Sequence, residues 1–377
     1  MKYEMIKLKE LCIVNQGLQI PISKRYKEPG ENRFFYITVQ FLKDNGENYY
    51  IENPPKSVTC TENEILVVRT GNTGQVITGV AGCFHNNFFK VTPNEKVFPK
   101  YLYYALNNKK MHDAMLNAAS GTTIPDLKHS SFYDLEIPLP ELSVQKKIAK
   151  ILDNICDKLK LNNEINNNLY KLSNEIHKNW MNERKDRETT DFINIKEFGK
   201  ILMGQSPKGE SYNYEFEGLP LINGAADYEN GYLKAQKYTT KPKKVAHYGD
   251  LVFCIRATIG LLVVSDNDYC LGRGVASISN INELYKEYAF HIINNSIDEF
   301  KRMATGSVIL GISREDIEKI KVIVPTEEEI NKYHQIQKPL LDKMGIIRKE
   351  NQVLINLRDT LLPRLINGEI DLDNIEI

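Results

Sequence analysis

The segment "FYDLEIPLPELSVQKKIAKIL", Phe132 to Leu152, changes its hydrophobic period halfway along. The pattern over Asp134–Leu139 predicts a short strand that is stopped by Pro138 and Pro140, and from Ile148 onward the apolar residues recur at helical spacing. A second segment, "IEKIKVIVPTEEEINKYHQI" from Ile317 to Ile336, makes the same change from strand to helix through a proline. The chain therefore predicts one structural unit that is used twice.

A shift of about 185 residues brings the two halves of the chain into register. The stretch "ASGTTIPDLKHSSFYDLEIPLP" (Ala119–Pro140) falls on "ATGSVILGISREDIEKIKVIVP" (Ala304–Pro325) without a gap. Upstream, "NEILVVRTGNTG" (Asn63–Gly74) resembles "GDLVFCIRATIG" (Gly249–Gly260), and each reads as an apolar strand that ends in an arginine and a glycine-bearing turn. Self-similarity at a fixed period indicates a duplicated architecture. We expect a strand-rich mixed domain followed by one long helix, present twice.

Each repeat ends in a long apolar stripe with alternating steps of three and four residues, which is typical of a helix that packs along another helix. The two stripes are expected to face each other as an antiparallel pair that holds the two domains at a fixed distance. Asn162, Asn163 and Asn166–Asn168 would place polar groups near this seam, and Asn351 and Arg358 interrupt the second stripe. The stripes consist of Ile148, Leu152, Ile155, Leu159, Ile165, Leu169, Leu172 and Ile176, and of Leu340, Met344, Ile347, Leu354, Leu361 and Leu365.

Start signals accompany both helices. Thr326 and Glu329 form a T-x-x-E capping box, and Ser143 is the expected cap of the first helix. Pro339 and Pro363 are expected to kink the second helix, because each removes a backbone donor. The fold class we predict is α+β, with two pseudo-repeated mixed α/β domains separated by two long antiparallel helices that form a coiled coil. The predicted boundaries are 1–142 for the first domain, 143–186 for the first helix, 187–325 for the second domain and 326–377 for the second helix and tail.

Composition narrows the class of protein. Apolar residues make up 42% and charged residues 26% of the 377 residues, as in ordinary globular proteins. The 49 basic residues balance the 49 acidic residues, so a nucleic-acid ligand would require clustered cations or a partner that shares the contacts. The six cysteines lack disulfide-framework spacing, and there is no signal-peptide core or apolar run of about 20 residues. These features predict a cytoplasmic protein that does not enter a membrane.

No catalytic constellation emerges from the motifs. The stretch "ENPPKS" (Glu52–Ser57) resembles the Asn-Pro-Pro-aromatic loop of DNA amino-methyltransferases, but Lys56 replaces the aromatic residue and no glycine-rich turn for S-adenosylmethionine precedes it. A Pro-Pro turn between strands is therefore expected. The "PDLK" tetrapeptide (Pro125–Lys128) resembles a nuclease fragment, although such short patterns arise by chance. The chain also lacks a phosphate loop, clustered metal-binding histidines and a nucleophile elbow, so we expect no metal and no enzymatic activity.

Turns and basic stretches supply the candidates for nucleic-acid contact. Arginine and lysine can reach phosphate or guanine, and hydroxyl and amide side chains suit phosphate oxygens and base edges. The second repeat adds a basic stretch with interleaved aromatic residues, Tyr232 to Tyr248. The DNA-binding candidates are Lys24, Arg25, Arg69, Thr70, Asn72, Thr122, Thr123, Gln205, Lys208, Lys241, Lys243, Lys244, Arg256, Arg273 and Ser307.

Taken together, the order of these motifs resembles the specificity subunit of a type I restriction-modification system. The similarity rests on "IPLPELSVQKKIAKIL" (Ile137–Leu152) and "LRDTLLPRLINGEIDL" (Leu357–Leu372), and it covers essentially the whole chain. Ile330 departs from the pattern, because it occupies the place of Gln145 in the second repeat. The resemblance implies two target-recognition domains, each of which reads one half of a split duplex DNA site.

The resemblance also implies partners. Two methyltransferase subunits would dock on the helices, restriction or translocase subunits would join that complex, and S-adenosylmethionine would bind only to the methyltransferase partner. Two other classes stay open at this point: a methyltransferase or nuclease with degenerate motifs, and a coiled-coil scaffold for protein partners. The partner-binding candidates are Gln145, Ile148, Leu152, Leu354 and Leu361.

Overall fold

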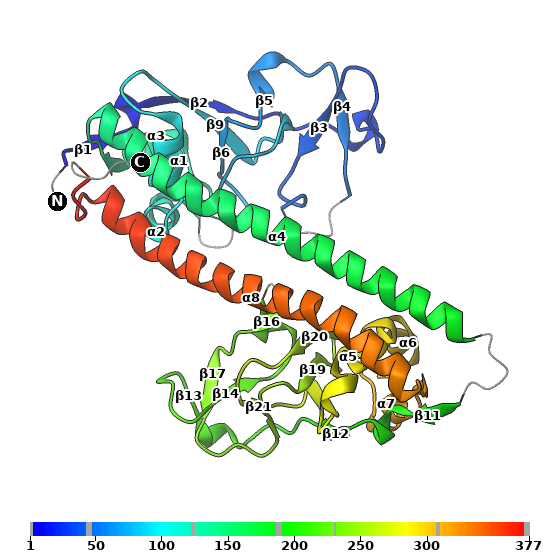
Figure 1. The fold of residues 1–377 in the computed structure, drawn as a ribbon. Coiled ribbons are helices and arrows are strands. Elements are labelled where there is room, and N and C mark those ends of the chain that lie inside the picture. The colour runs from blue at the N-terminus through cyan, green and yellow to red at the C-terminus, as the bar shows by residue number, and fades with distance from the viewer. Residues whose placement is uncertain are drawn as a thin grey trace. The chain divides into compact units, whose positions relative to one another are not determined.

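The computed structural model describes residues 3–42, 47–121, 125–185, 191–229, 231–306 and 310–372. The chain divides into two compact units, of which unit 1 comprises Met1–Leu159 with Leu354–Ile377 and unit 2 comprises Lys160–Val353. The two longest helices, α4 (Leu142–Lys185) and α8 (Glu327–Ile366), each contribute to both units (Figure 1). Over the described ranges, no helix is long and apolar enough to cross a membrane.

Unit 1 contains two four-stranded sheets and a separate strand pair. One sheet has the order β2-β9-β6-β7 and is wholly antiparallel, whereas the other has the order β4-β3-β8-β5 and includes a parallel β3–β8 pair. The strands are β1 (Met5–Lys7), β2 (Cys12–Gln16), β3 (Arg33–Ile37), β4 (Tyr50–Glu52), β5 (Thr59–Cys60), β6 (Ile65–Val68), β7 (Val76–Ile77), β8 (Gly82–Phe84), β9 (Phe88–Pro93) and β10 (Glu136–Pro138). The helices are α1 (Pro99–Leu106), α2 (Lys109–Ala118) and α3 (His129–Tyr133), with 3-10 turns at Leu8–Glu10, Ile22–Lys24 and Lys56–Val58.

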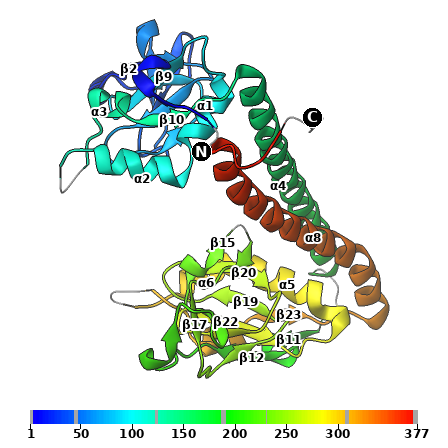
Figure 2. The same ribbon diagram turned by 90° about the vertical axis from the view of Figure 1, so that its left-hand side faces the viewer.

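Unit 2 repeats this plan. Its antiparallel sheet has the order β12-β22-β19-β20, and its mixed sheet has the order β13-β17-β14-β21-β18 with a parallel β14–β21 pair. The strands are β11 (Phe192–Asn194), β12 (Lys200–Met203), β13 (Tyr212–Asn213), β14 (Leu219–Ile222), β15 (Tyr228–Glu229), β16 (Tyr232–Leu233), β17 (Lys237–Thr239), β18 (Val245–Ala246), β19 (Leu251–Cys254), β20 (Gly260–Val264), β21 (Tyr269–Leu271), β22 (Val275–Ser279) and β23 (Lys321–Ile323). The helices are α5 (Lys286–Asn295), which lies against β20 (Figure 2), α6 (Ile297–Met303) and α7 (Arg314–Glu318), with 3-10 turns at Ile195–Glu197, Gly209–Ser211, Ala225–Asp227 and Glu283–Tyr285.

Hydrogen bonds show that the repeat extends to single residues. Ser120 bridges Asp126 in unit 1, and Thr305 bridges Gly311 in unit 2, which is a shift of 185 positions. The hydroxyl of Tyr101 donates to the carbonyl of Pro138 over 2.6 Å. In unit 2 the hydroxyl of Tyr288 donates in the same way to the carbonyl of Ile323 over 2.9 Å. The predicted α+β fold with duplicated mixed domains and two long helices is confirmed.

The long helices begin close to their predicted starts. The Thr326–Glu329 capping box is confirmed, because the Thr326 amide donates to the Glu329 carboxylate and the Glu329 amide donates to the Thr326 hydroxyl. The predicted cap at Ser143 is wrong: α4 already begins at Leu142, and the Gln145 amide donates to the carbonyl of Glu141, so Ser143 lies within the first turn. The Asn53-Pro-Pro segment follows β4 and leads into the 3-10 turn Lys56–Val58, as the expectation of a turn between strands requires.

In unit 1 the two long helices complete one hydrophobic core. Ile148 and Leu152 of α4 are fully buried together with Phe89 of β9 and Tyr101 of α1, and Leu365 of α8 belongs to the same cluster. Burial of apolar side chains from both helices and from the sheet provides the main stabilisation of this unit. The predicted contact between the two helical stripes is confirmed here.

In unit 2 the buried face of α4 differs from the predicted stripe. Ile165 is 43% exposed and Leu172 is 51% exposed, whereas Asn162, Ser173 and His177 are buried. The apolar period predicts that one face of the helix is buried. The face beside it is buried instead, because its polar side chains find hydrogen-bond partners on α8 and α5. Buried polar side chains need hydrogen-bond partners, and the supply of partners therefore decides which face turns inward.

These buried polar groups form a hydrogen-bonded cluster. Ser173 Oγ donates to Oε1 of Gln337 on α8 over 2.6 Å and lies 2.9 Å from Nε2 of His291 on α5. Further along the helices, the Asn162 amide donates to the Asn351 side chain over 2.9 Å. Polar residues at such a seam fix the register of two helices at some cost in stability. The expectation of polar groups near the seam is confirmed for Asn162 and for Asn163, which accepts from the Asn351 side chain, whereas Asn167 and Asn168 are exposed.

The buried imidazole of His291 predicts acid sensitivity in unit 2. Burial lowers the pKa of His291 to about 4, from an ordinary value of 6.5. Between pH 7 and pH 5 the unfolded chain therefore binds a proton that the folded chain excludes, which removes about 2 kcal/mol of stability. We expect urea unfolding of the His291→Asn variant to lose less stability over this pH interval than the native chain. His247→Asn, which changes an exposed histidine, is the control, and an unchanged pH dependence in His291→Asn would contradict the prediction.

Candidate nucleic-acid interface

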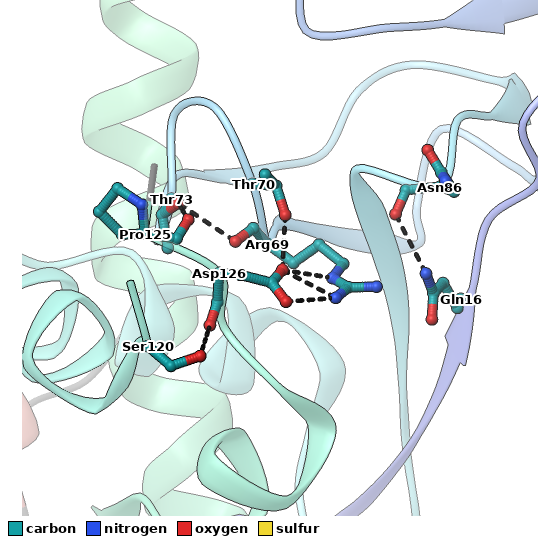
Figure 3. A network of polar contacts seen from close by, with 8 residues as sticks. All are labelled: Gln16, Arg69, Thr70, Thr73, Asn86, Ser120, Pro125 and Asp126. Atoms are coloured by element: carbon teal, nitrogen blue, oxygen red, sulfur yellow. Dashed lines mark hydrogen bonds and ion pairs between the residues drawn. The ribbon is translucent and has the colours of Figure 1, made fainter. Parts of the chain in front are cut away.

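Each unit has an end of its antiparallel sheet where three turns meet, and we call this region the turn edge. In unit 1 the amide of Gly17 donates to the carbonyl of Phe88 over 3.0 Å, and the amide of Arg69 donates to the carbonyl of Asn87 over 2.7 Å. These bonds bring the end of β2, the end of β6 and the start of β9 together. Polar side chains that follow these strands therefore lie on one edge, shown in part in Figure 3.

Arg69 is held by a carboxylate at this edge. Its Nε and Nη2 donate to Asp126 Oδ1 over 3.0 and 2.7 Å, and Nη2 also donates to Oδ2 over 2.7 Å (Figure 3). The Thr70 hydroxyl donates to the same carboxylate over 2.6 Å. The side chain of Arg69 is only 19% exposed. A bidentate pair of this kind is strong and geometrically specific, so Arg69 and Thr70 fasten the β6 turn to the segment before α3.

The pKa of Asp126 reflects this arrangement. Burial alone would raise it, but the hydrogen bonds from Thr70 and Arg69, together with the charge of Arg69, lower the pKa below its ordinary value. The carboxylate is therefore ionised at neutral pH. Sequence reasoning missed Asp126, which lies in the short "PDLK" stretch, because its partners are more than 50 positions away in the chain.

The structure corrects the predicted equivalence of Arg69 and Arg256. Val68 pairs with Phe88 and Cys254 pairs with Val275, so the residue that follows each strand is Arg69 in unit 1 and Ile255 in unit 2. Ile255 is 3% exposed and belongs to the hydrophobic core. The two arginines are therefore offset by one residue, and a buried aliphatic side chain in unit 2 takes the place of the ion-paired arginine of unit 1.

Arg256 lies instead at the place of Thr70. Thr70 forms an isolated bridge with Asp126, and Arg256 forms the corresponding bridge with Gly311. Unit 2 therefore has no side chain where unit 1 has the carboxylate. The Arg256 side chain is exposed, and it forms no hydrogen bond or ion pair with any residue that the structure describes.

Two further candidates join Arg256 at the turn edge of unit 2. The amide of Gln205 donates to the carbonyl of Leu271 over 2.8 Å, and the amide of Arg273 donates to Ser206 Oγ over 3.4 Å. The amide of Ile255 donates to the carbonyl of Gly274 over 2.9 Å. Arg256 follows Ile255 and Arg273 precedes Gly274, so both arginines are next to this hydrogen-bonded pair. The side chains of Gln205 and Arg273 are exposed.

The remaining candidates for DNA contact are dispersed. Arg25 is half-buried and donates to the carbonyl of Ile20, and its guanidinium lies over the ring of Tyr36 at 5.1 Å. Thr122, Thr123 and Ser307 lie outside the described residues. The others are exposed except for Lys244, which is half-buried: Lys24, Asn72, Lys208, Lys241, Lys243 and Lys244.

The partner-binding candidates fall into two groups. Gln145 is 1% exposed, and its amide accepts from Phe98 N over 2.7 Å and donates to the carbonyls of Lys96 and Pro140 over 3.1 and 2.8 Å. Any contribution of Gln145 to partner binding is therefore through the position of α4. Ile148 and Leu152 are likewise buried in unit 1, and Leu354 and Leu361 are half-buried.

The described residues also lack a metal site. Within the described ranges, no group of three or more histidine, cysteine, aspartate or glutamate side chains is placed to hold a metal ion. Each turn edge offers hydrogen-bond donors and acceptors on rigid strand ends, and this arrangement suits recognition of polar surfaces.

Comparison with known proteins identifies the class. The sequence matches the family described as "Type I restriction modification DNA specificity domain" twice, over residues 1–171 and 187–356. The putative type I restriction enzyme MjaX specificity subunit of Methanocaldococcus jannaschii is 30% identical over 303 residues, which cover 75% of this chain and 71% of that protein. The MjaIX specificity subunit of the same organism is 26% identical over 325 residues, covering 77% and 73%.

The fold agrees with this match. The crystal structure of the type I restriction-modification S subunit from M. genitalium superposes with a TM-score of 0.66 and 18% identity, covering 97% of this chain and 96% of that one. The two repeats are thus a pair of DNA specificity domains. The chain belongs to the family of type I restriction-modification specificity subunits, the non-catalytic subunits that direct DNA recognition. The predictions of a DNA-recognition subunit and of a chain that is not an enzyme are confirmed by its relatives.

The Arg69–Asp126 pair predicts a stabilising role in unit 1. Asp126→Ala leaves a largely buried guanidinium and the Thr70 hydroxyl without their acceptor, and we expect it to lower the free energy of unfolding by about 1–3 kcal/mol. Asp134→Ala is the matched control, because it removes the Lys7–Asp134 pair, whose side chains are 39% and 68% exposed, and such pairs contribute about 0–1 kcal/mol. Urea unfolding at neutral pH measures both. Equal losses in the two variants would contradict the structural role of Asp126.

Proposed function

We propose that this chain reads a bipartite duplex DNA target in the cytoplasm, with one half-site for each specificity domain. Methyltransferase subunits, two per chain, dock on the helical part and carry the S-adenosylmethionine, and restriction subunits join that complex. The chain itself supplies the choice of sequence and requires no cofactor for it.

The observation that carries this proposal is that one sheet plan occurs twice with different side chains at corresponding turns. Two folds with the same strand order present their turn edges on equivalent strands, so they suit the same kind of ligand. The residues at these edges differ, with Thr70 and Asn86 in unit 1 and Arg256 and Arg273 in unit 2. Base-edge readout depends on the donor and acceptor pattern of such side chains, so two half-sites of different sequence follow.

Phosphate contacts fit the distribution of charge. The exposed lysines Lys208, Lys241 and Lys243 in unit 2 are free to meet phosphate oxygens, although the whole chain has zero formal net charge. Contacts of this kind release counterions and make binding sensitive to salt. The methyltransferase subunits would add further phosphate contacts.

Selection from randomised duplex DNA tests the bipartite target. The full chain, co-expressed with its methyltransferase subunit, is expected to enrich two short motifs separated by a spacer of constant length and undefined sequence. Affinity for that duplex should fall steeply with salt, as phosphate neutralisation requires. Recovery of one contiguous motif, or of no motif, would overturn the proposal.

An apolar surface on the long helices is available for the methyltransferase subunits. On α4 within unit 2, Leu161, Ile165 and Leu172 are 56%, 43% and 51% exposed, and on α8 Ile346 and Val353 are 61% and 65% exposed. The steps of four and seven residues place each set along one side of its helix. Exposed apolar stripes at this spacing suit a partner helix laid into the surface.

Charged substitutions on this surface test the docking. The double variant Ile165→Glu with Leu172→Glu is expected to lower the yield of methyltransferase that co-purifies with the chain by about tenfold or more, because burying an unpaired carboxylate in an interface is costly. Its thermal unfolding should remain close to that of the native chain, since both side chains are about half exposed. Leu116→Glu, on α2 and 37% exposed, is the control. Native-like co-purification by the double variant would count against docking at these residues.

A further inference from the structure

The turn edges of the two units occupy the same place in the fold, and hydrogen bonds establish their equivalence. The amide of Leu18 donates to the carbonyl of Phe84 in unit 1, as the amide of Gln205 donates to the carbonyl of Leu271 in unit 2. Phe88 and Val275 begin the following strands, and each donates to the carbonyl three residues earlier. This correspondence pairs Leu18 with Gln205, Thr70 with Arg256 and Asn86 with Arg273.

The chemistry at these equivalent positions is different. Unit 1 carries an apolar, a hydroxyl and an amide side chain, whereas unit 2 carries an amide and two guanidinium groups. Arg69, the nearby arginine of unit 1, adds no net positive charge to the edge, because it is paired with Asp126. In unit 2, neither Arg256 nor Arg273 has an ion pair with any residue that the structure describes.

Gly311 preserves the exposure of Arg256. A Cβ added at Gly311 would lie 3.1 Å from Arg256 Cγ and 3.3 Å from the carbonyl oxygen of Ile255, which is tighter than ordinary contact. A side chain at this position would press on the stem of Arg256, and an acidic one would bind its guanidinium, as Asp126 binds Arg69. The glycine therefore leaves Arg256 uncompensated and unobstructed.

We propose that the turn edge of unit 2, formed by Gln205, Arg256 and Arg273, is a DNA-contacting site through which the second domain binds guanine edges and phosphates, and that the turn edge of unit 1 contacts DNA through uncharged side chains. This inference rests on the proposed function and assigns different chemistry to its two domains. Two guanidinium groups on one rigid edge suit acceptor-rich surfaces, and arginine is the side chain that most often reads guanine through its O6 and N7 acceptors.

A clear consequence concerns the two half-sites. The half-site that unit 2 reads should require guanine at one or two positions, and binding at that half-site should carry the larger salt dependence. The half-site that unit 1 reads should depend on uncharged contacts, to which the half-buried side-chain amide of Asn86 can contribute. The two domains would then contribute unequally to affinity although their folds match.

The test uses the complex of the full chain with its methyltransferase subunits and the duplex recovered by selection. Arg256→Gln and Arg273→Gln should each weaken binding about tenfold, and the double variant about a hundredfold. Lys200→Gln is the matched control, because Lys200 is an exposed cation at the opposite end of β12. It should bind within about twofold of the native complex.

Base preference and salt dependence of binding distinguish a guanine contact from a phosphate contact. Loss of a guanine contact relaxes specificity at one position of one half-site, whereas loss of a phosphate contact weakens binding to all sequences and reduces the salt slope by about one. Either outcome supports a DNA contact at this edge. If the double variant binds like Lys200→Gln, with the same base preferences and the same salt slope, the inference is overturned while the bipartite reading stands. If the native complex selects no split motif, the proposed function itself fails.

A second pair of variants examines Gly311. Gly311→Asp is expected to weaken binding about tenfold by capturing the guanidinium of Arg256, whereas Gly311→Asn, of nearly equal size and without charge, should weaken it much less. In the Arg256→Gln background, the difference between the two variants should shrink to about twofold. Thermal unfolding verifies that each variant is folded, and an undiminished difference in that background would overturn the role given to Arg256.

Discussion

The short strand that precedes each long helix is the constraint on which the rest of the structure depends. β10 pairs with β1 and β23 pairs with β11, so the chain leaves each domain from a strand that is tied to the beginning of that domain. Ile137 and Val322, at the centres of these strands, are 0% and 1% exposed. Because a strand pair with a buried central residue fixes both direction and register, each helix starts at a defined place relative to its own domain.

The two repeats hold the beginning of the helix by different means. In unit 1 the buried amide of Gln145 bonds to Phe98 N and to two backbone carbonyls, and so joins the first turn of α4 to the segment before α1. In unit 2 the corresponding residue is Ile330, which is 1% exposed and packs in the core. A buried amide that satisfies backbone groups and an aliphatic side chain that fills space are alternative solutions to the same requirement.

A similar exchange occurs at the turn edges, which we propose as the surfaces that contact DNA. Unit 1 closes its β6 turn with a charged pair, and unit 2 closes the equivalent turn by burying Ile255 in the apolar core. Because Ile255 holds the turn by an apolar contact, the next residue, Arg256, is not needed to stabilise it and is exposed. Duplication of a domain therefore allows one copy to bind its arginine in an ion pair for stability while the other copy leaves an arginine exposed at the equivalent turn.

The sequence by itself determined the duplication, the two long helices, the Thr326 capping box and the absence of a catalytic motif, because repeats, periodicity and caps are local patterns. It also indicated the family. Tertiary structure decided which arginines are bound and which are exposed: Arg69 and Asp126 are 57 positions apart, and the register that places Arg256 beside Gly311 arises from strand pairing. It likewise decided which face of α4 is buried in unit 2, since Ser173 turns inward only where Gln337 and His291 can satisfy its hydroxyl. Contacts between distant segments depend on closure of the whole fold, and local spacing does not encode them.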